Sequence, residues 1–213
     1  MSEAAVKAIT SRDNPLLVRV RKLAADPAGY RRGGEVWIEG EHLCAAYAQR
    51  GGVAAQAIVG ESAWRAPAMR ALANTAAAVA VLPDALMAGL GSLESPAPLG
   101  FIVAWADAGE IDPATPSVVL DRLQDAGNVG TILRSAAAFG FGQVIALNGT
   151  AALWSPKVLR AGMGAHFALR LVERVEAEAL AALTLPLLAT SSHAAQTIAA
   201  ASLPWPCAWV FGH

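Results

Sequence analysis

The chain has 213 residues, of which 55% are hydrophobic and only 15% are charged, and its formal net charge is −1. This composition excludes an intrinsically disordered protein, and the near-zero net charge excludes a polycation that binds nucleic acid through overall charge. The length is sufficient for one large domain or two small ones with a buried core.

The sequence contains no signal for a membrane span, a secretory leader or a metal site. No run of about 18 strongly apolar residues occurs, and the N-terminal segment MSEAAVKAITSRDNP lacks the apolar core of a signal peptide. Cys44 and Cys207 lie far apart, and neither they nor the 4 histidines show metal-ligand spacing. We therefore expect a reduced, cytoplasmic protein with no bound metal and no membrane contact.

The first half of the chain alternates short helices and strands. Residues 14–25 place their apolar side chains at helical spacing, which predicts an amphipathic helix. Strands are predicted at residues 36–40, 56–60, 78–82 and 100–106. Helices are predicted between them, at residues 42–50, 69–77 and 84–93. This order predicts a small α/β domain over residues 1–108.

A proline-containing segment then interrupts the alternation. GEIDPATPS, which begins at Gly109, combines two prolines and a glycine with polar residues. This composition predicts a linker. We place the linker at residues 109–116 and a second domain at residues 117–213.

The second domain again alternates strands and helices. Strands are predicted at residues 117–121, 143–148, 167–172, 186–190 and 207–211. Helices are predicted at residues 129–140, 155–164, 176–183 and 194–201. This alternation predicts a mostly parallel sheet that is covered on both faces. No Asp, Glu, Lys or Arg follows Glu178, which supports strands buried on both sides.

Short segments that follow the strands of this sheet are candidates for a binding site. They are residues 121–130, 148–157, 190–193 and 212–213. Ligands of open parallel sheets bind outside the carboxyl ends of the strands. We therefore expect these segments to converge.

The first of these segments leads into a helix that carries Asn128 and Arg134. Gly127 and Gly130 permit tight turning and close backbone approach, and Asn128 is able to cap the helix with its side chain. Arg134 falls outside the apolar stripe of the helix. Taken alone, the two residues are explained more simply by a helix cap and a solvated arginine.

The second segment begins a short helix with two cations. Ser155 before Pro156 is a strong helix start, and Lys157 and Arg160 follow on neighbouring faces. A helix start beside two cations suits a phosphate. A well-capped surface helix explains the same residues.

Basic residues gather in two regions of this nearly neutral chain. Residues 1–33 contain seven basic and three acidic residues, a net charge of +4, and residues 117–174 contain six and three, a net of +3. Such regions suit an anionic ligand at one face. They also suit solvated helix faces.

Several long segments resemble a known family. LDRLQDAGNVGTILRSAAAFGF, SPKVLRAGMGAHF and the terminal WVFGH are similar to motifs of the SpoU/TrmH-type RNA 2′-O-ribose methyltransferases, members of the SPOUT superfamily. In the first half, ITSRDNPLLVRVRKL, YRRGGEVWIEGEHL and SPAPLGFIVA are similar to the small RNA-binding domain of that family. The resemblance covers nearly the whole chain.

The resemblance implies a fold and an activity. The fold is a small N-terminal α/β RNA-binding domain followed by a parallel-sheet, Rossmann-like SPOUT domain of the trefoil-knot family. The activity is methyl transfer from S-adenosylmethionine to a ribose 2′-hydroxyl in rRNA or tRNA, without a metal. In the family, two subunits pair through the C-terminal domain, which implies a homodimer.

The resemblance also implies roles for individual residues. Arg134 would activate or position the hydroxyl, and Asn128 would fix Arg134, the loop or the ribose. Thr190 and Gly212 would line the cofactor pocket, mainly through backbone groups. The cations expected to contact RNA are Arg12, Arg19, Arg31, Arg32, Lys157 and Arg160. Lys157 and Arg160 would hold RNA phosphates or the dimer partner.

The chain departs from the family at several positions. The family usually has Pro where this chain has Ala126 and often Ser where it has Gly162, and we expect these small residues to be tolerated. The Glu of the second motif would follow His213, and the third motif, with its Ser and Asn, would come later. We therefore expect a C-terminally truncated protein that lacks the knot segment and is itself inactive.

Two other hypotheses remain open. One is a non-catalytic RNA-binding module of the same fold, which the absence of a Glu directly after His213 and of a later Ser-x-Asn would support. The other is a Rossmann-like nucleotide enzyme. Against it, no GxGxxG follows the first strand of the second domain.

Overall fold

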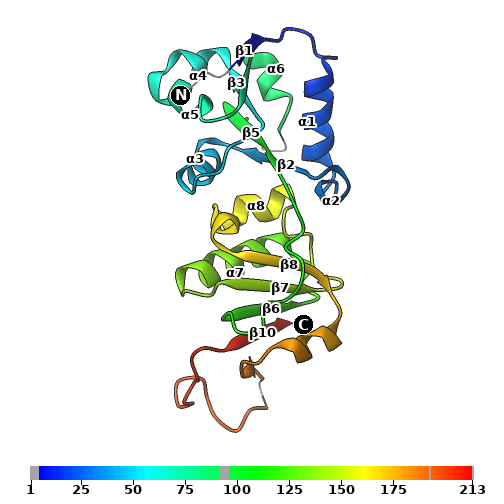
Figure 1. Ribbon diagram of the computed structural model, residues 1–213, viewed down its shortest axis with the longest axis vertical. Helices are drawn as coiled ribbons and strands as arrows, with labels where there is room; N and C mark the ends of the chain where they lie inside the picture. Colours follow the sequence, from blue (N-terminus) through cyan, green and yellow to red (C-terminus); the bar gives the residue numbers. More distant parts are fainter. Residues whose placement is uncertain (1–4, 92–95, 192, 213) are drawn as a thin grey trace.

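Two five-stranded sheets, each with its own helices, follow one another along the chain (Figure 1). The structure is a computed structural model that describes residues 5–91, 96–191 and 193–212. The strands of the first sheet lie within residues 5–104 and those of the second within residues 117–212. The α/β class predicted from the sequence is confirmed. Within the described ranges, no helix has the length and hydropathy needed to cross a bilayer.

The first sheet is mixed, with strand order β1-β4-β3-β5-β2. Its strands are β1 (Ala5–Ala8), β2 (Glu35–Glu39), β3 (Gln56–Gly60), β4 (Ala78–Leu82) and β5 (Leu99–Ala104). β4 pairs in parallel with β1 and β3, whereas β5 runs antiparallel to β3 and β2. Its helices are α1 (Pro15–Ala25), α2 (Tyr30–Gly33), α3 (Glu41–Gln49), α4 (Glu61–Arg65), α5 (Pro67–Ala73) and α6 (Asp84–Ala88).

The predicted strands and long helices of the first half are present, but short elements were missed. β1, α2 and α4 have four or five residues each, too few to show a period. The helix predicted at residues 69–77 ends at Ala73, and the one predicted at residues 84–93 ends at Ala88. Residues 92 and 93 of that prediction lie outside the described residues.

The second sheet is parallel throughout its described pairs, with strand order β8-β7-β6-β10-β9. Its strands are β6 (Ser117–Asp121), β7 (Gln143–Leu147), β8 (Arg170–Val175), β9 (Leu187–Ala189) and β10 (Ala208–Gly212). The α-helices are α7 (Ala126–Ala138) and α8 (Pro156–Gly162), and the 3-10 helices are η1 (Ala165–Ala168) and η2 (Ala177–Ala182). The predicted parallel sheet is confirmed.

Alternate residues of the central strands enter two different apolar layers, as the pleat of a strand requires. Leu120 packs in a cluster with Val129 and Leu133 of α7. Val119 faces the other way and joins a cluster with Leu180 of η2. The β6–β7–β8 part of the sheet is therefore covered on both faces.

Several predictions for residues after 165 are wrong. Residues 194–201 form turns rather than a helix, and the side chains at 193–200 are exposed. An isolated segment of this length is not a stable helix unless one face is buried. β9 has only three residues, and Leu187 is 49% exposed, so the expected two-sided burial fails there. Residues 177–182 form a 3-10 helix, and β8 begins three residues later than expected because η1 precedes it.

Candidate functional site

A cavity of about 470 Å³ opens at the carboxyl edge of the second sheet. Its walls include Asn128, Thr190 and Gly212, three of the residues expected to form the site. They come from the segments that follow β6, β9 and the end of β10. The expected convergence of these segments is therefore present. The segment after β7 is hydrogen-bonded to the first loop through the Ala151 N–H and the Leu123 carbonyl (2.8 Å) but does not line this cavity.

The helix at this edge begins earlier than the sequence indicated, and Asn128 is not its cap. Asp125 is the N-cap, and its Oδ1 accepts a hydrogen bond from the Asn128 N–H at 2.6 Å. The three residues before Val129 adopt helical geometry, because a capping aspartate satisfies the first free N–H groups. The side chain of Asn128 is thereby released toward the cavity, where it is exposed.

A second cavity of about 630 Å³ adjoins the first and shares Leu123 and Asn128 with it. Arg122 lines it from a left-handed backbone position, with φ of 56°. Its guanidinium donates to both carboxylate oxygens of Asp121, at 2.7 and 2.9 Å. This hydrogen bonding holds the pKa of Asp121 below its usual value. Sequence patterns did not single out Arg122, because its loop conformation leaves no periodic signal.

Gly212 has a steric reason to be glycine. In the β10–β6 register Gly212 lies opposite Asp121. A Cβ on Gly212 would lie 3.0 Å from the Asp121 Cβ and 3.3 Å from Oδ2. A larger residue would therefore push the aspartate and narrow the cavity.

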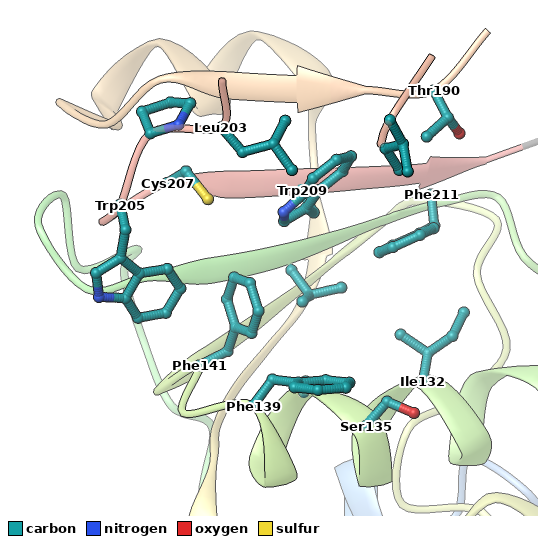
Figure 2. Close-up of a pocket in the computed structure, with 14 residues that line it drawn as sticks. Ile132, Ser135, Phe139, Phe141, Thr190, Leu203, Trp205, Cys207, Trp209 and Phe211 are labelled. Carbon is teal, nitrogen blue, oxygen red and sulfur yellow. The ribbon is translucent and has the colours of Figure 1, made fainter. Parts of the chain in front are cut away.

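A larger apolar pocket of about 730 Å³ adjoins the polar edge (Figure 2). Figure 2 shows Ile132 and Ser135 of α7, and Phe139 directly after it, facing Trp209 and Phe211 of β10. No lining residue is charged. The pocket shares Ile132, Thr190 and Phe211 with the 470 Å³ cavity, so a polar edge and an apolar wall meet at the same strand ends.

Arg134 lies elsewhere on α7. Six residues separate it from Asn128, which corresponds to about 120° around a helix. Its side chain is exposed and lines none of the three cavities described above. Among the described residues it has no hydrogen-bond or ion-pair partner. The structure therefore does not bring Arg134 and Asn128 to one cavity within a single chain.

The α8 region agrees with its predicted start. The Ser155 hydroxyl accepts from the Val158 N–H at 3.4 Å, and Pro156 occupies the first turn. Lys157 and Arg160 are exposed. A Cβ on Gly130 would lie 2.4 Å from the Ala161 Cβ, so this glycine allows close contact between α7 and α8.

The cations of the first half are mostly exposed, and none of them lines the three cavities described above. Arg12, Arg19 and Arg32 are exposed, and the last two form ion pairs with Glu35 and Asp26. Arg31 differs, because its guanidinium donates to the buried carboxylate of Glu173 at 2.7 Å. Its ion pair gives Arg31 a structural role that the sequence did not indicate.

Among the residues that the structure describes, no group of three or more His, Cys, Asp or Glu is placed to hold a metal ion. Both cysteines are free and buried.

Comparison with known proteins identifies relatives of both halves. A profile of the SpoU rRNA Methylase family matches residues 116–213. An uncharacterized tRNA/rRNA methyltransferase of Synechocystis is 30% identical, over 97% of this chain and 78% of its own length. The mitochondrial rRNA methyltransferase 3 of Mus musculus is 54% identical over 61 residues, which is 29% of this chain. The chain spans only 15% of the length of that relative.

Solved structures share the fold. The crystal structure of an RNA 2′-O ribose methyltransferase superposes with a TM-score of 0.79 at 28% identity, covering 97% of this chain and 81% of its own. The SpoU methyltransferase AviRb from Streptomyces viridochromogenes, in complex with AdoMet, gives 0.80 at 21% identity, covering 93% and 81%. At that identity AviRb shows the fold alone. The resemblance predicted from the sequence motifs is confirmed, and the chain belongs to the SpoU rRNA methylase family.

Proposed function

We propose that the protein transfers a methyl group from S-adenosylmethionine to a ribose 2′-hydroxyl of rRNA or tRNA. The observation that carries this proposal is the convergence of Asn128, Thr190 and Gly212 on one cavity at the carboxyl edge of the second sheet. Relatives named as rRNA methyltransferases support the reaction class. A 23S rRNA guanosine 2′-O-methyltransferase of Bacillus subtilis, 28% identical over 64% of this chain, supports the ribose as the target.

The cavities suit S-adenosylmethionine in size and chemistry. Ligand pockets typically have volumes of about 300–1,000 Å³ and combine apolar walls with a few polar groups. Here Thr190 lies where the apolar pocket and the polar cavity meet. The apolar wall suits an adenine ring, and the strand-end backbone at Gly212 suits its polar substituents. AviRb, which shares the fold, was solved with AdoMet.

The residues of the chain would prepare the ribose rather than the methyl donor. S-adenosylmethionine supplies a methyl group on a sulfonium, which is already a good electrophile. A ribose hydroxyl is a weak nucleophile until its proton is removed. A guanidinium stays charged in proteins and is a poor base. Arg134 would therefore hold the hydroxyl and the adjacent phosphate while the hydroxyl proton leaves to solvent, and Asn128 would fix the ribose or the loop.

The position of Arg134 supports the expected homodimer as a proposal. Because Arg134 lies outside the cavity that contains Asn128 on its own chain, we infer that a second copy supplies it across a C-terminal interface. Phe139, the C-cap of the same helix, is 77% exposed and is open to contact with a partner. Lys157 and Arg160 lie exposed on α8 and would hold RNA phosphates or the partner.

RNA contact is assigned to the exposed cations. Arg12, Arg19 and Arg32 would add contacts from the first half, whereas the guanidinium of Arg31 is occupied by Glu173. The family's trefoil knot is inferred from the shared fold. A cytoplasmic location is inferred as well, and two cysteines that are both free support it.

A complementation assay tests the reaction and the dimer together. In the protein expressed from its native gene, Arg134→Ala should lower tritium transfer from labelled S-adenosylmethionine to rRNA by about 100-fold or more, since one lost charged contact to the reacting group costs roughly 3 kcal/mol. Asn128→Ala should also be impaired. A mixture of the two variants should regain about a quarter of the wild-type rate, because random pairing gives heterodimers with one intact site.

The outcomes separate the hypotheses. Wild-type rate in Arg134→Ala would contradict its role, and no recovery on mixing would contradict the shared site. A native protein that binds RNA but transfers no methyl group would support the second candidate, a non-catalytic RNA-binding module. That candidate would explain the separation of Arg134 from the cavity without a second copy of the chain.

A further inference from the structure

A buried carboxylate connects the two halves of the chain. Glu173 lies on β8, and its side chain is 4% exposed. Its oxygens accept hydrogen bonds from the Tyr30 hydroxyl at 2.6 and 2.7 Å and from the Arg31 guanidinium at 2.7 Å. They also accept from the backbone N–H of Leu153 at 2.8 Å. Two donors thus come from α2 in the first half and one from the loop before α8.

The donors around Glu173 are held in place. Burial and the negative charge of Glu173 raise the pKa of Tyr30 far above its ordinary value, so the hydroxyl keeps its proton. The Tyr30 ring packs edge-on against Trp105, with centroids 4.9 Å apart. Removing one donor would leave part of the buried negative charge uncompensated, which is strongly destabilising.

The predicted linker is hydrogen-bonded to residues of the second sheet. Gln143 is fully buried, and its side chain bonds both the N–H and the carbonyl of Asp112, at 2.9 and 3.1 Å. The Arg170 guanidinium donates to the Glu110 carbonyl at 2.7 Å. These bonds fix the linker to the second sheet.

Contacts at α8 complete the junction. α8 lies between the second sheet and the first half (Figure 1). Leu159 of α8 belongs to the buried core around β2 and β5. The Tyr47 and Phe167 rings pack edge-on at 5.2 Å, and His42 Nε2 lies 3.3 Å from the Met163 carbonyl. Among these contacts, the one at Glu173 combines burial, charge and several directional bonds.

We propose that Glu173 is a positioning residue, which fixes the RNA-binding cations of the first half relative to the cavity at the edge of the second sheet. The proposal rests on the proposed function. An RNA that contacts both halves binds as a two-site ligand, and its affinity depends on how well the spacing of the two sites is defined. A short RNA that contacts one half gains nothing from that spacing.

The test compares Glu173→Gln with Glu35→Gln in the native protein. Both changes remove a carboxylate that pairs with an arginine. The partner of Glu35 is Arg19, so that ion pair connects α1 and β2 inside the first half. Spin labels at Arg50→Cys and Ala138→Cys, both exposed, report the distance between the halves. The native cysteines are buried and should remain unlabelled. Double electron–electron resonance should give a broadened distance distribution in Glu173→Gln and an unchanged distribution in Glu35→Gln.

Binding and kinetics supply the functional readout. In Glu173→Gln the Kd and KM for a full-length 23S rRNA transcript should rise about tenfold. The Kd for a hexanucleotide RNA and for S-adenosylmethionine should stay within about twofold, and so should kcat, because the cavity itself is intact. If Glu173→Gln does not fold, Tyr30→Phe removes one donor, keeps the ring against Trp105, and should change the same quantities in the same direction.

The two proposals fail in different ways. If the unaltered protein neither binds nor methylates rRNA or tRNA, the proposed function and this inference are both overturned. If it does, and Glu173→Gln keeps the native distance distribution and rRNA affinity, only the positioning role is overturned. An equal loss of affinity for long and short RNA would also overturn it.

Discussion

The His166 ring packs directly against Gly162 at the end of α8. A Cβ on Gly162 would lie 2.6 Å from the His166 Cε1 and 2.9 Å from Nδ1. The imidazole cannot swing aside easily, because it is 2% exposed and its Nε2 lies 2.8 Å from the Leu153 carbonyl. Gly162 therefore fits this space as a glycine, whereas the serine common in the family would meet the His166 ring.

Gly162→Ser should lower the free energy of unfolding by about 1–3 kcal/mol, the usual cost of overpacking. Urea denaturation at neutral pH measures the change. Gly33→Ser is the matched control, because a Cβ there would meet no atom within 4 Å. Equal stability of the two variants would show that the His166 ring yields to the new side chain.

At the same scale, the candidate site was predictable only in part. Asn128, Thr190 and Gly212 were placed together because the carboxyl ends of parallel strands share an edge. The cap was assigned to the wrong residue, since Asp125 stands three positions earlier and both residue types cap helices well. Arg122 was missed because the conformation of a short loop is not encoded in a periodic pattern.

The start of α7 offers a test at the level of the element. Ala126 is the first helical residue after the N-cap Asp125, whose φ of −73° and ψ of 114° suit a residue that precedes proline. Ala126→Pro should therefore raise the free energy of unfolding by about 0.5–1 kcal/mol. Thermal unfolding measures it. Thr131→Pro, inside the same helix, should instead cost roughly 3 kcal/mol, and a loss in both variants would contradict the assigned helix start.

Elements were predictable where their residues bury one face. β6, β7 and α7 have clear apolar periods, and the sequence predicts all three. The stretch at 194–201 has good helix formers, but the side chains at 194–200 are exposed, and it forms turns. Propensity without burial does not determine a short element.

At the scale of the whole molecule, a buried histidine makes stability depend on pH. Burial lowers the pKa of His166 to about 4, whereas an unfolded histidine titrates near 6.5. Between about pH 4 and pH 6.5, the histidine is therefore protonated in the unfolded chain and neutral in the folded chain. The contribution of this group is complete above about pH 6.5 and is lost as the pH falls toward 4.

The free energy of unfolding should fall by about 2 kcal/mol from this group between pH 7 and pH 5. Urea denaturation at the two pH values measures the total change. His166→Gln retains a donor for the Leu153 carbonyl and cannot titrate, so its change over the same range should be smaller by that amount. Identical pH profiles for the variant and the native protein would contradict the assignment.

The junction between the halves is the part of the fold least accessible to sequence reasoning. Arg31 and Glu173 are separated by 142 residues along the chain, and each has ordinary neighbours in sequence. Their pairing follows from how the two sheets are placed, which local patterns do not specify. The two-domain division itself was suggested by composition, whereas the bonding of the linker to Gln143 was not.

The position of β10 has a consequence for the order of assembly. β10 follows its neighbours in sequence, yet it lies between β6 and β9, and β9 pairs among the described strands with β10 alone. β9 therefore joins the sheet only together with β10, whose pairing with β6 closes a loop of more than eighty residues. Closing such a long loop makes folding slow. The cavity at Asn128, Thr190 and Gly212 should thus form in the last step of folding, after β6, β7 and β8 have joined.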